Sequence, residues 1–436
     1  MEKTKSRRRL QIVFESEVPD EQPQRQQSKN KADSKQEEGT KGHLWTFIAI
    51  ATIPMVLVLG NSMLVPILPD MQERMGISRF QSSLVITLFS ITAGLIIPIS
   101  GYLSDRFSRK AVIIPSLIIY GAAGVLAGFG AIWNSYTILI ISRAIQGLGA
   151  AGTAPIAMAL VGDLYKGGTE SKALGLIEAS NGSGKVLSPI LGSLLALLVW
   201  FAPFFAFPVF CLLALLAVIF IIKEPKKQKE PQALKAYISQ IGTILKEKGR
   251  WLITSFFAGS LALFILFGVL FYLSQILEKE PYNIDGVKKG LVLAIPLLGQ
   301  VITAYTTGAL IKKNGTLMRW LMNIGLILMT VALGLTIFLS NNLYIFIGLL
   351  TLSGIGTGLL LPCLNTMITG SVEREQRGMI TSLYNSLRFI GVAFGPPLFG
   401  WLMNISHKAI FITVSSLSLI TLALVFFLIK PQGKVN

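Results

Sequence analysis

The stretch that decides the fold is Gly101-Tyr-Leu-Ser-Asp105-Arg106-Phe-Ser-Arg109-Lys110. It is a short, strongly charged turn between two apolar runs, residues 80–102 and 111–132. An apolar run of about 20 residues is long enough to cross a bilayer as a helix, so the two runs form a membrane-spanning hairpin. The Lys and Arg side chains of the turn assign it to the cytoplasmic side.

The composition excludes a soluble protein of this length. The chain has 436 residues, of which 52% are hydrophobic and only 14% are charged. A formal net charge of +17 could indicate a nucleic-acid partner. We expect none, because the basic residues gather in the connections between apolar runs, as in the cytoplasmic loops of membrane proteins. The two cysteines, Cys211 and Cys363, give no metal-ligand spacing, and no metal or cofactor is expected.

Twelve apolar runs are long enough to span a membrane, and basic residues fill alternate connections. We therefore predict an all-α membrane protein whose twelve transmembrane helices form two pseudo-symmetric six-helix bundles, with both termini in the cytoplasm. The runs are residues 44–69, 80–102, 111–132, 136–162, 172–197, 202–222, 251–277, 288–311, 317–339, 343–370, 379–403 and 409–429.

The same pattern predicts the domain limits. Residues 1–43 are polar and charged and read as a disordered cytoplasmic tail. The first bundle covers residues 44–222 and the second covers 251–430, followed by a short cytoplasmic tail at 431–436. Residues 223–250 form a cytoplasmic central loop, within which 234–245 are expected to make a short helix on the membrane surface.

An internal repeat relates the two bundles at an offset of 207 residues, the separation of Gly101 and Gly308. Glycine and proline recur at this offset in three pairs of spans, which is hard to produce by chance. Such duplication is expected of a transporter whose halves rock about a central site. The offset relates Gly147, Gly149 and Pro155 to Gly354, Gly356 and Pro362, and it relates Gly184 and Pro189 to Gly391 and Pro396.

The charged turn, read as Gly-x-Leu-x-Asp-Arg-x-x-Arg-Lys, resembles the signature loop of the major facilitator superfamily of secondary transporters, with Ser108 where a glycine is usual. The resemblance covers about residues 44–430. It implies a cytoplasmic gate in which Asp105 meets the start of the eleventh helix near residues 378–380 and Gly101 permits close packing. It also implies that Arg109 pairs with an acid at the end of the fourth helix. The gate residues are Gly101, Asp105, Arg106, Arg109, Lys110 and Asp163.

The second-half counterpart of the charged turn, residues 308–315, has no aspartate. We therefore expect the gate to be one-sided, with its ionic contact in the first half only.

Two further stretches resemble motifs of the drug:proton antiporter branch of this superfamily. In the first span, Gly60 is followed by Pro66 and Pro69, which remove helix hydrogen bonds and should bend the outer end. In the fifth span, small residues share one face and should let the first or eighth helix approach closely, a seam that in the family favours export. These are Gly184, Ser188 and Gly192, beside Pro189, and the eleventh span repeats the pattern with Gly391, Gly395 and Pro396.

Away from the ends of the predicted spans lie four ionisable residues: Arg143, Glu178, Lys185 and Arg388. Glu178 is the candidate proton carrier, since a buried carboxylate can titrate in the physiological range. The alternative is a structural ion pair of Glu178 with Arg143 or Arg388. Arg143 either holds helices together through carbonyls and Gln146 or assists proton transfer. Three cations against one carboxylate favour anionic or zwitterionic substrates over purely cationic dyes.

We therefore predict a proton-coupled antiporter of the cell membrane, not an enzyme, which exports small amphipathic organic molecules in the manner of multidrug efflux proteins. Its partners are the substrate, protons and the lipid bilayer, and we expect a monomer. A dedicated exporter of one metabolite, such as a siderophore or an antibiotic, is the alternative within transport. A sensor that binds a ligand without moving it is a further alternative. A membrane-embedded enzyme is disfavoured because the sequence holds no cluster of metal ligands or nucleophiles.

Overall fold

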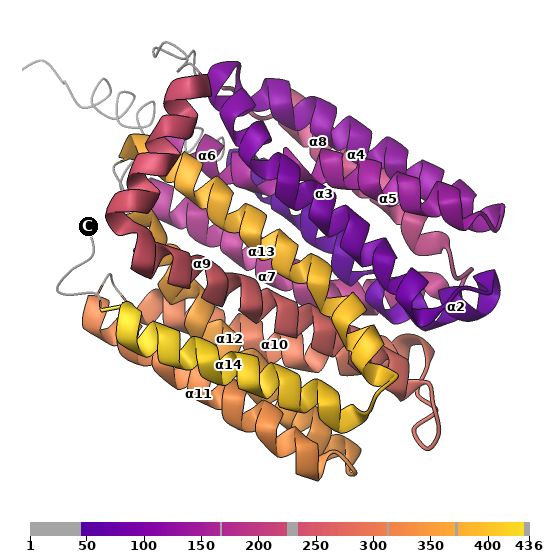
Figure 1. The fold of residues 1–436 in the computed structure, drawn as a ribbon. Helices are drawn as coiled ribbons and strands as arrows, with labels where there is room; N and C mark the ends of the chain where they lie inside the picture. Colours follow the sequence, from indigo (N-terminus) through magenta and orange to yellow (C-terminus); the bar gives the residue numbers. More distant parts are fainter. Residues whose placement is uncertain (1–44, 166–167, 225–233, 312–313, 371–373, 431–436) are drawn as a thin grey trace, which may run out of the picture. The chain divides into compact units, whose positions relative to one another are not determined.

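A computed structural model describes residues 45–165, 168–224, 234–311, 314–370 and 374–430 of the chain (Figure 1). Residues 47–436 make up one unit. The described residues form helices joined by short turns, which confirms the predicted all-α fold. The first helix covers residues 45–62. It is followed by η1 (Val65–Ile67), α2 (Leu68–Met75), α3 (Arg79–Arg106), α4 (Arg109–Ile132), α5 (Tyr136–Ala151), α6 (Ala154–Leu164), α7 (Gly168–Ala196), α8 (Ala202–Phe220), α9 (Leu234–Leu277), α10 (Gly286–Ile311), α11 (Gly315–Leu339), α12 (Leu343–Gly370), α13 (Arg374–Met403) and α14 (His407–Leu428).

Eleven helical segments of the described chain are long and apolar enough to cross a membrane. The remaining segment of this length is α7, whose 29 residues extend for about 43 Å at 1.5 Å per residue. It carries the polar and charged residues of the predicted fifth span, which lower its hydropathy. Twelve helices therefore fit the predicted spans.

Two spans differ from the sequence-based prediction. The fourth span is broken into α5 and α6 at Gly152, because Pro155 lies in the first turn of α6 and cannot continue the preceding hydrogen-bond ladder. The prediction of a separate surface helix at 234–245 is wrong, because α9 runs from Leu234 to Leu277 as one helix of 44 residues. The reason is local, since residues 246–250 (Lys-Glu-Lys-Gly-Arg) include good helix formers and no proline.

The helix pairings of the first half recur in the second. In the first half α5 packs against α3 and α4, and α4 packs against α8. In the second half α12 packs against α10 and α11, and α11 packs against α14. A close contact repeats with the same offset: a Cβ added at Gly147 would lie 2.4 Å from the Phe89 carbonyl oxygen, and one at Gly354 would lie 2.5 Å from that of Pro296. The pseudo-symmetric arrangement is thus confirmed.

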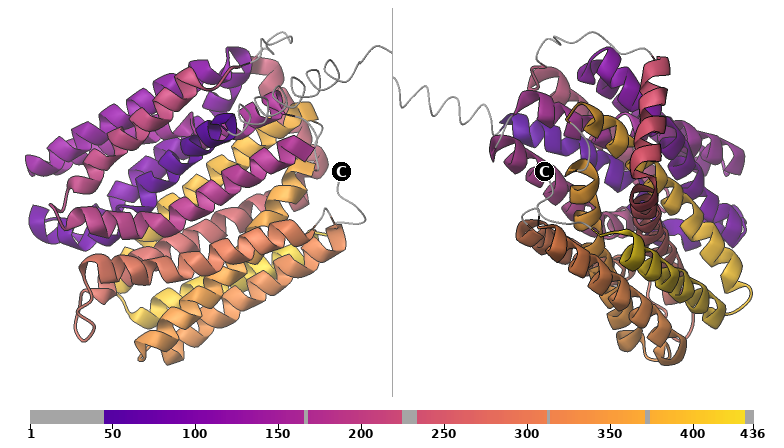
Figure 2. Two further views of the ribbon diagram at one scale, coloured as in Figure 1. Left: turned by 180° about the vertical axis from the view of Figure 1, so that it is seen from behind. Right: turned by 60° about the vertical axis from the view of Figure 1, so that its left-hand side comes forward.

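Two helix–helix contacts join the halves, and each pairs one helix of the first half with one helix of the second. α13 of the second half packs along α3 of the first, and α7 of the first half packs along α10 of the second. Figure 1 shows α13 and α7 lying between the two groups of helices, and Figure 2 shows the same layering from behind. We call the end of the unit at the α3–α4 turn the basic end, and the end at α2 the far end.

Candidate functional site

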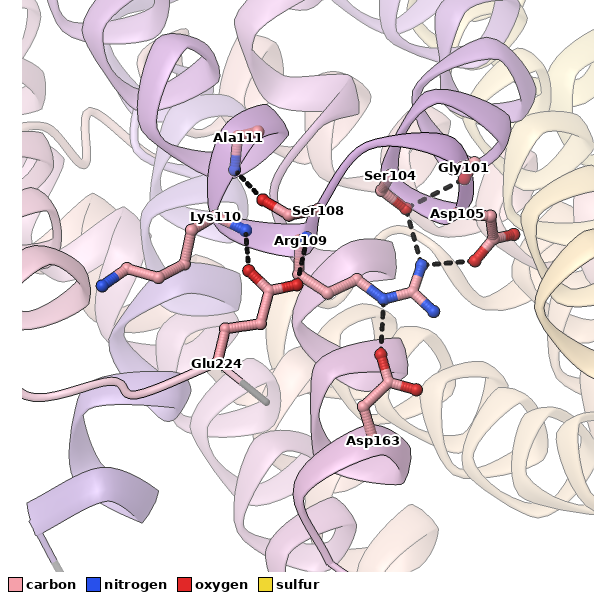
Figure 3. A network of polar contacts seen from close by, with 9 residues as sticks. All are labelled: Gly101, Ser104, Asp105, Ser108, Arg109, Lys110, Ala111, Asp163 and Glu224. Atoms are coloured by element: carbon pink, nitrogen blue, oxygen red, sulfur yellow. Dashed lines mark hydrogen bonds and ion pairs between the residues drawn. The ribbon is translucent and has the colours of Figure 1, made fainter. Parts of the chain in front are cut away.

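The predicted gate residues meet at the basic end, where Arg109 is the centre of a polar cluster (Figure 3). Its side chain is 10% exposed and donates from Nε to Asp163 over 2.7 Å and from Nη1 to Asp105 over 2.5 Å. Nη1 also donates to the Ser104 hydroxyl over 2.7 Å. The predicted pairing of Arg109 with Asp163 is confirmed. Because Asp163 is on α6 and Asp105 is on α3, the guanidinium ties the ends of three helices together.

Glu224, which follows α8, is a member of this cluster that sequence reasoning missed. Its carboxylate accepts hydrogen bonds from the backbone N–H groups of Arg109, over 2.6 Å, and Lys110, over 3.0 Å. These N–H groups open α4 and have no partner within the helix, and the positive end of the helix dipole favours a carboxylate there. The Lys110 ammonium in turn donates to the carbonyls of Ile219 and Ile222 at the end of α8. A lone acid after a span carries no sequence signal for this role.

The other gate predictions are met only in part. Gly101 does permit close packing, since a Cβ added there would lie 2.8 Å from the Ser382 hydroxyl of α13. Residues 378–380, where the prediction placed the start of the eleventh helix, lie inside α13, which begins at Arg374. The contact of Asp105 with the actual helix start falls where residues 371–373, and the side chains of 374–377, are outside the described residues. It remains a prediction. Arg106 donates to the Tyr102 hydroxyl over 3.1 Å.

The second-half counterpart of the gate differs from the first in packing. No described atom lies within 4 Å of a Cβ added at Gly308. Residues 312 and 313 of that turn lie outside the described residues, so the predicted one-sidedness of the gate remains a prediction.

The first span is not only bent, as predicted, but divided into separate helices at its prolines. The first helix ends at residue 62, and Pro66 and Pro69 occupy the first turns of η1 and α2. At the break the Leu64 N–H donates to Asn61 instead of Gly60. The Gly60 carbonyl is thereby left for a side chain, and Arg143 donates to it over 3.2 Å.

Arg143 is fully buried and bridges three helices. It donates to the Val85 carbonyl of α3 over 2.9 Å, to the Asn61 amide oxygen over 3.1 Å and to Gln146 on its own helix. The Phe89 ring lies 4.4 Å from its guanidinium carbon. These partners are carbonyls, amides and a ring, which favours the structural role of Arg143 over the role in proton transfer. The break at Pro66 is what makes this arrangement possible.

The small-residue faces of α7 and α13 lie in tight helix contacts. A Cβ added at Gly192 would lie 2.0 Å from the Met63 carbonyl oxygen, and one at Gly184 would lie 3.3 Å from Val58, both in the first span. Ser188 turns its hydroxyl back to the Gly184 carbonyl over 2.6 Å and so behaves as a small residue. The predicted close approach of the first helix is confirmed.

The eighth helix also reaches this face, because a Cβ at Gly290 of α10 would lie 2.6 Å from the Pro189 carbonyl oxygen. On α13, Gly391 and Gly395 pack equally closely against the backbone of Ser260 and Phe264 on α9, in the turns that precede and contain Pro396. Whether these seams set the direction of transport remains a prediction.

The remaining intramembrane ions are Arg388, Lys185 and Glu178. Arg388 on α13 donates to the Asn385 amide oxygen over 3.2 Å and lies 5.4 Å from the Tyr384 ring centre, while its buried Nε has no hydrogen-bond partner among the described residues. Lys185 is half-buried on α7. The side chain of Glu178 is outside the described residues, so both its role as proton carrier and its alternative role as ion-pair partner remain predictions.

The far end holds an ionic cluster that the sequence did not single out. Lys289, in the first turn of α10, is 2% exposed and hydrogen-bonds the Glu278 carboxylate, which lies directly after α9. Its ammonium is also 3.9 Å from the Asp70 carboxylate of α2. Asp70 belongs to the first half and the other two residues to the second. We call Asp70, Glu278 and Lys289 the far-end cluster.

Comparisons with known proteins agree with this geometry. A sequence model of the major facilitator superfamily matches residues 50–283 and 272–436. The chain belongs to the major facilitator superfamily. This confirms the resemblance that the charged turn at residues 101–110 carries, and it identifies the chain as a multi-pass membrane transporter.

Its relatives within the superfamily include exporters. The bacillibactin exporter of Bacillus subtilis (strain 168) is 46% identical over 389 residues, which cover 88% of this chain and 96% of that protein. Multidrug resistance protein 1 of the same organism is 26% identical over 366 residues, with coverages of 83% and 90%. The crystal structure of the human organic anion transporter MFSD10 (TETRAN) matches with a TM-score of 0.68 and 19% identity, covering 88% of this chain and 99% of that one. This last likeness supports the fold alone.

Proposed function

We propose that this protein exports a small anionic amphipath of the siderophore class in exchange for protons. The observation that carries the proposal is the similarity to the bacillibactin exporter, which extends over 96% of that protein. A dedicated metabolite exporter is therefore favoured over a broad multidrug pump. In this proposal the basic end and both termini face the cytoplasm, because basic connections between spans are retained on that side.

Arg388 supports an anionic substrate. A cation in the middle of a span is costly unless a partner compensates it. Among the described residues, Arg388 contacts one amide oxygen and one aromatic ring, and one buried N–H of its guanidinium has no acceptor. A carboxylate or an ionised phenol of the substrate would supply the missing acceptor and charge.

The test is a comparison of a deletion strain with its parent, grown with and without iron. Loss of the exporter should lower the iron-chelating activity of the medium and raise that of the cells. Arg388→Gln, introduced on a complementing copy, should restore little export, whereas Lys408→Gln removes the same charge from an exposed helix end and should restore it fully. Unchanged chelator levels in medium and cells of the deletion strain would refute the proposal.

Proton coupling is tested separately in membrane vesicles. Collapse of the pH gradient with an ionophore should stop uptake of the chelator into inside-out vesicles, because protons moving down their gradient drive the exchange. Uptake that continues without any ion gradient would contradict proton exchange.

Multidrug export is the second candidate, since Multidrug resistance protein 1 matches 83% of this chain. It predicts efflux of cationic dyes such as ethidium from cells that express the protein. If dyes leave the cells at the same rate with and without Arg388→Gln, while chelator levels do not change, the broad function replaces the dedicated one.

A further inference from the structure

The far-end cluster exists because the first span is broken. Pro66 has no N–H, so η1 and α2 begin anew after the first helix. Because Pro69 stands at the i+4 position of Val65, the Val65 carbonyl accepts from the Leu68 N–H and from the hydroxyl of Ser274 of α9, the latter over 2.9 Å. This hydrogen bond holds η1 against α9 of the second half. α2 also packs against α9, and Asp70 comes to 3.9 Å from the ammonium of Lys289. The far ends of the two halves are thus joined by the Ser274 hydrogen bond, the ionic contact of Asp70 and a hydrogen bond from Arg79 to Asn404 over 3.2 Å.

The charges of the cluster do not balance. Two carboxylates, Asp70 and Glu278, share the single ammonium of Lys289, whose side chain is 2% exposed, while those of Asp70 and Glu278 are 43% and 22% exposed. Further charges face the cluster from the elements around it: Glu73 and Arg74 on α2, and Asp285 in the connection before α10. Lys279 in the same connection faces Arg79 of α3. When all three residues of the cluster are ionised they carry one excess negative charge, and the Glu278 carboxylate is the less exposed of the two.

The environment of Glu278 opposes its ionisation. Burial raises the pKa of the Glu278 carboxyl above its ordinary value, although Lys289 acts in the opposite direction. A neutral carboxylic acid can still accept a hydrogen bond from Lys289 through its carbonyl oxygen. With one proton added, the cluster becomes an ion pair plus one neutral acid, and its excess charge is gone.

We propose that Asp70 and Glu278 form a proton-binding site around Lys289, which takes up one proton from the outside as the far ends of the two halves close. The proposal deepens the proposed proton exchange and assigns the site of proton entry. After substrate has left, a proton from the acidic outer side neutralises the cluster and favours closure there. The empty transporter is then returned toward the cytoplasmic side.

The sign of the pH effect follows from linkage. In the closed arrangement the pKa of Glu278 is raised, whereas in an open, water-filled arrangement it returns toward its ordinary value. The closed form therefore binds the proton more tightly, and falling pH favours the closed form. Acid is expected to close the far end. A simple salt bridge, whose carboxylates are more acidic when paired, would instead open in acid.

The experiment is a distance measurement between the far ends in lipid nanodiscs without substrate. Spin labels are placed at Trp133 and Asn341, which are exposed in the far-end turns of the first and second halves. The two buried cysteines, Cys211 and Cys363, are first replaced by alanine. As the pH falls from about 8 to about 5, a range that covers raised carboxyl pKa values, the short-distance population should grow severalfold.

The variants separate this site from other titrating groups. Glu278→Gln and Asp70→Asn each imitate one bound proton and should give the closed population at high pH. The double variant leaves Lys289 buried without a carboxylate and should open the far end at every pH. Glu280→Gln removes an exposed carboxylate from the same connection and should keep the wild-type pH curve.

The proposal is overturned if acid opens the far end, or if the two single variants keep the wild-type pH curve. Because no substrate is present, this outcome is independent of the export assay. Acid closure that needs Asp70 and Glu278 in a protein without proton-driven flux would sustain the site and refute the exchange. Proton-driven flux in a protein whose far end does not respond to these variants would support the proton exchange and refute the site.

Discussion

Replacing Arg143 by glutamine removes a side chain that connects three helices. The change deletes hydrogen bonds to Val85, Gly60 and Asn61 and the contact with the Phe89 ring. Hydrogen bonds between membrane helices contribute roughly 0.6 to 1.7 kcal/mol each. A desolvated cation–π contact adds about 2 kcal/mol. Part of this is offset because a charge no longer has to be buried, so we expect a net loss of stability of about 3 kcal/mol.

Thermal unfolding of the purified protein in detergent measures this loss. Each kcal/mol is expected to lower Tm by about 2 °C in a chain of this size, so Arg143→Gln should melt about 6 °C below the wild type. Arg143→Lys keeps the charge but not the planar guanidinium, and a lysine cannot reach all three acceptors. Its free energy of unfolding should therefore fall by about 2 kcal/mol. Arg250→Gln removes an exposed arginine from α9 and should change stability by less than about 0.5 kcal/mol.

The same variants decide between the two roles of Arg143. If it acts structurally, the flux of Arg143→Lys falls at all pH values together with stability. If it assists proton transfer, stability stays near the wild type and the pH optimum of transport moves. A Tm for Arg143→Gln within one degree of the wild type, combined with a shifted pH profile, would refute the structural role.

Three further predictions concern the gate, the proton path and the seams. Asp105→Asn weakens the ion pair at the basic end and should change both the ratio of inward- to outward-open forms, measured by spin-label distances, and the flux; if neither changes, the gate is misassigned. Glu178→Gln should abolish proton-coupled efflux from vesicles, and intact coupling would exclude Glu178 as the carrier. Gly192→Val places a Cβ 2.0 Å from the Met63 carbonyl oxygen, and this overlap should lower the free energy of unfolding by roughly 1–3 kcal/mol. At Gly308 no described atom lies within 4 Å of an added Cβ, so Gly308→Val should leave thermal unfolding nearly unchanged.

Some site residues could be predicted from sequence because their role is local. The weakening of the first span at Pro66 and Pro69 could be predicted, since a missing N–H does not depend on distant partners. That the helix ends there could not, because Pro98 lies inside the continuous helix α3. Arg109 lies in a turn between two spans and had one candidate acid at a neighbouring helix end, Asp163. Lys289 and Glu278 gave no such signal, because a lysine and a glutamate near span ends are usually solvated.

The sequence by itself determined the number of spans, the repeat at an offset of 207 residues and the positions where glycine permits close packing. These properties depend on apolar length and backbone freedom, which each segment carries alone. Only the tertiary structure decided that Glu224 caps α4, that the Gly60 carbonyl is taken by Arg143, and that Asp70 meets Lys289 across the two halves. Such contacts depend on how helices are rotated about their axes and placed beside one another, and the chain order does not fix these quantities.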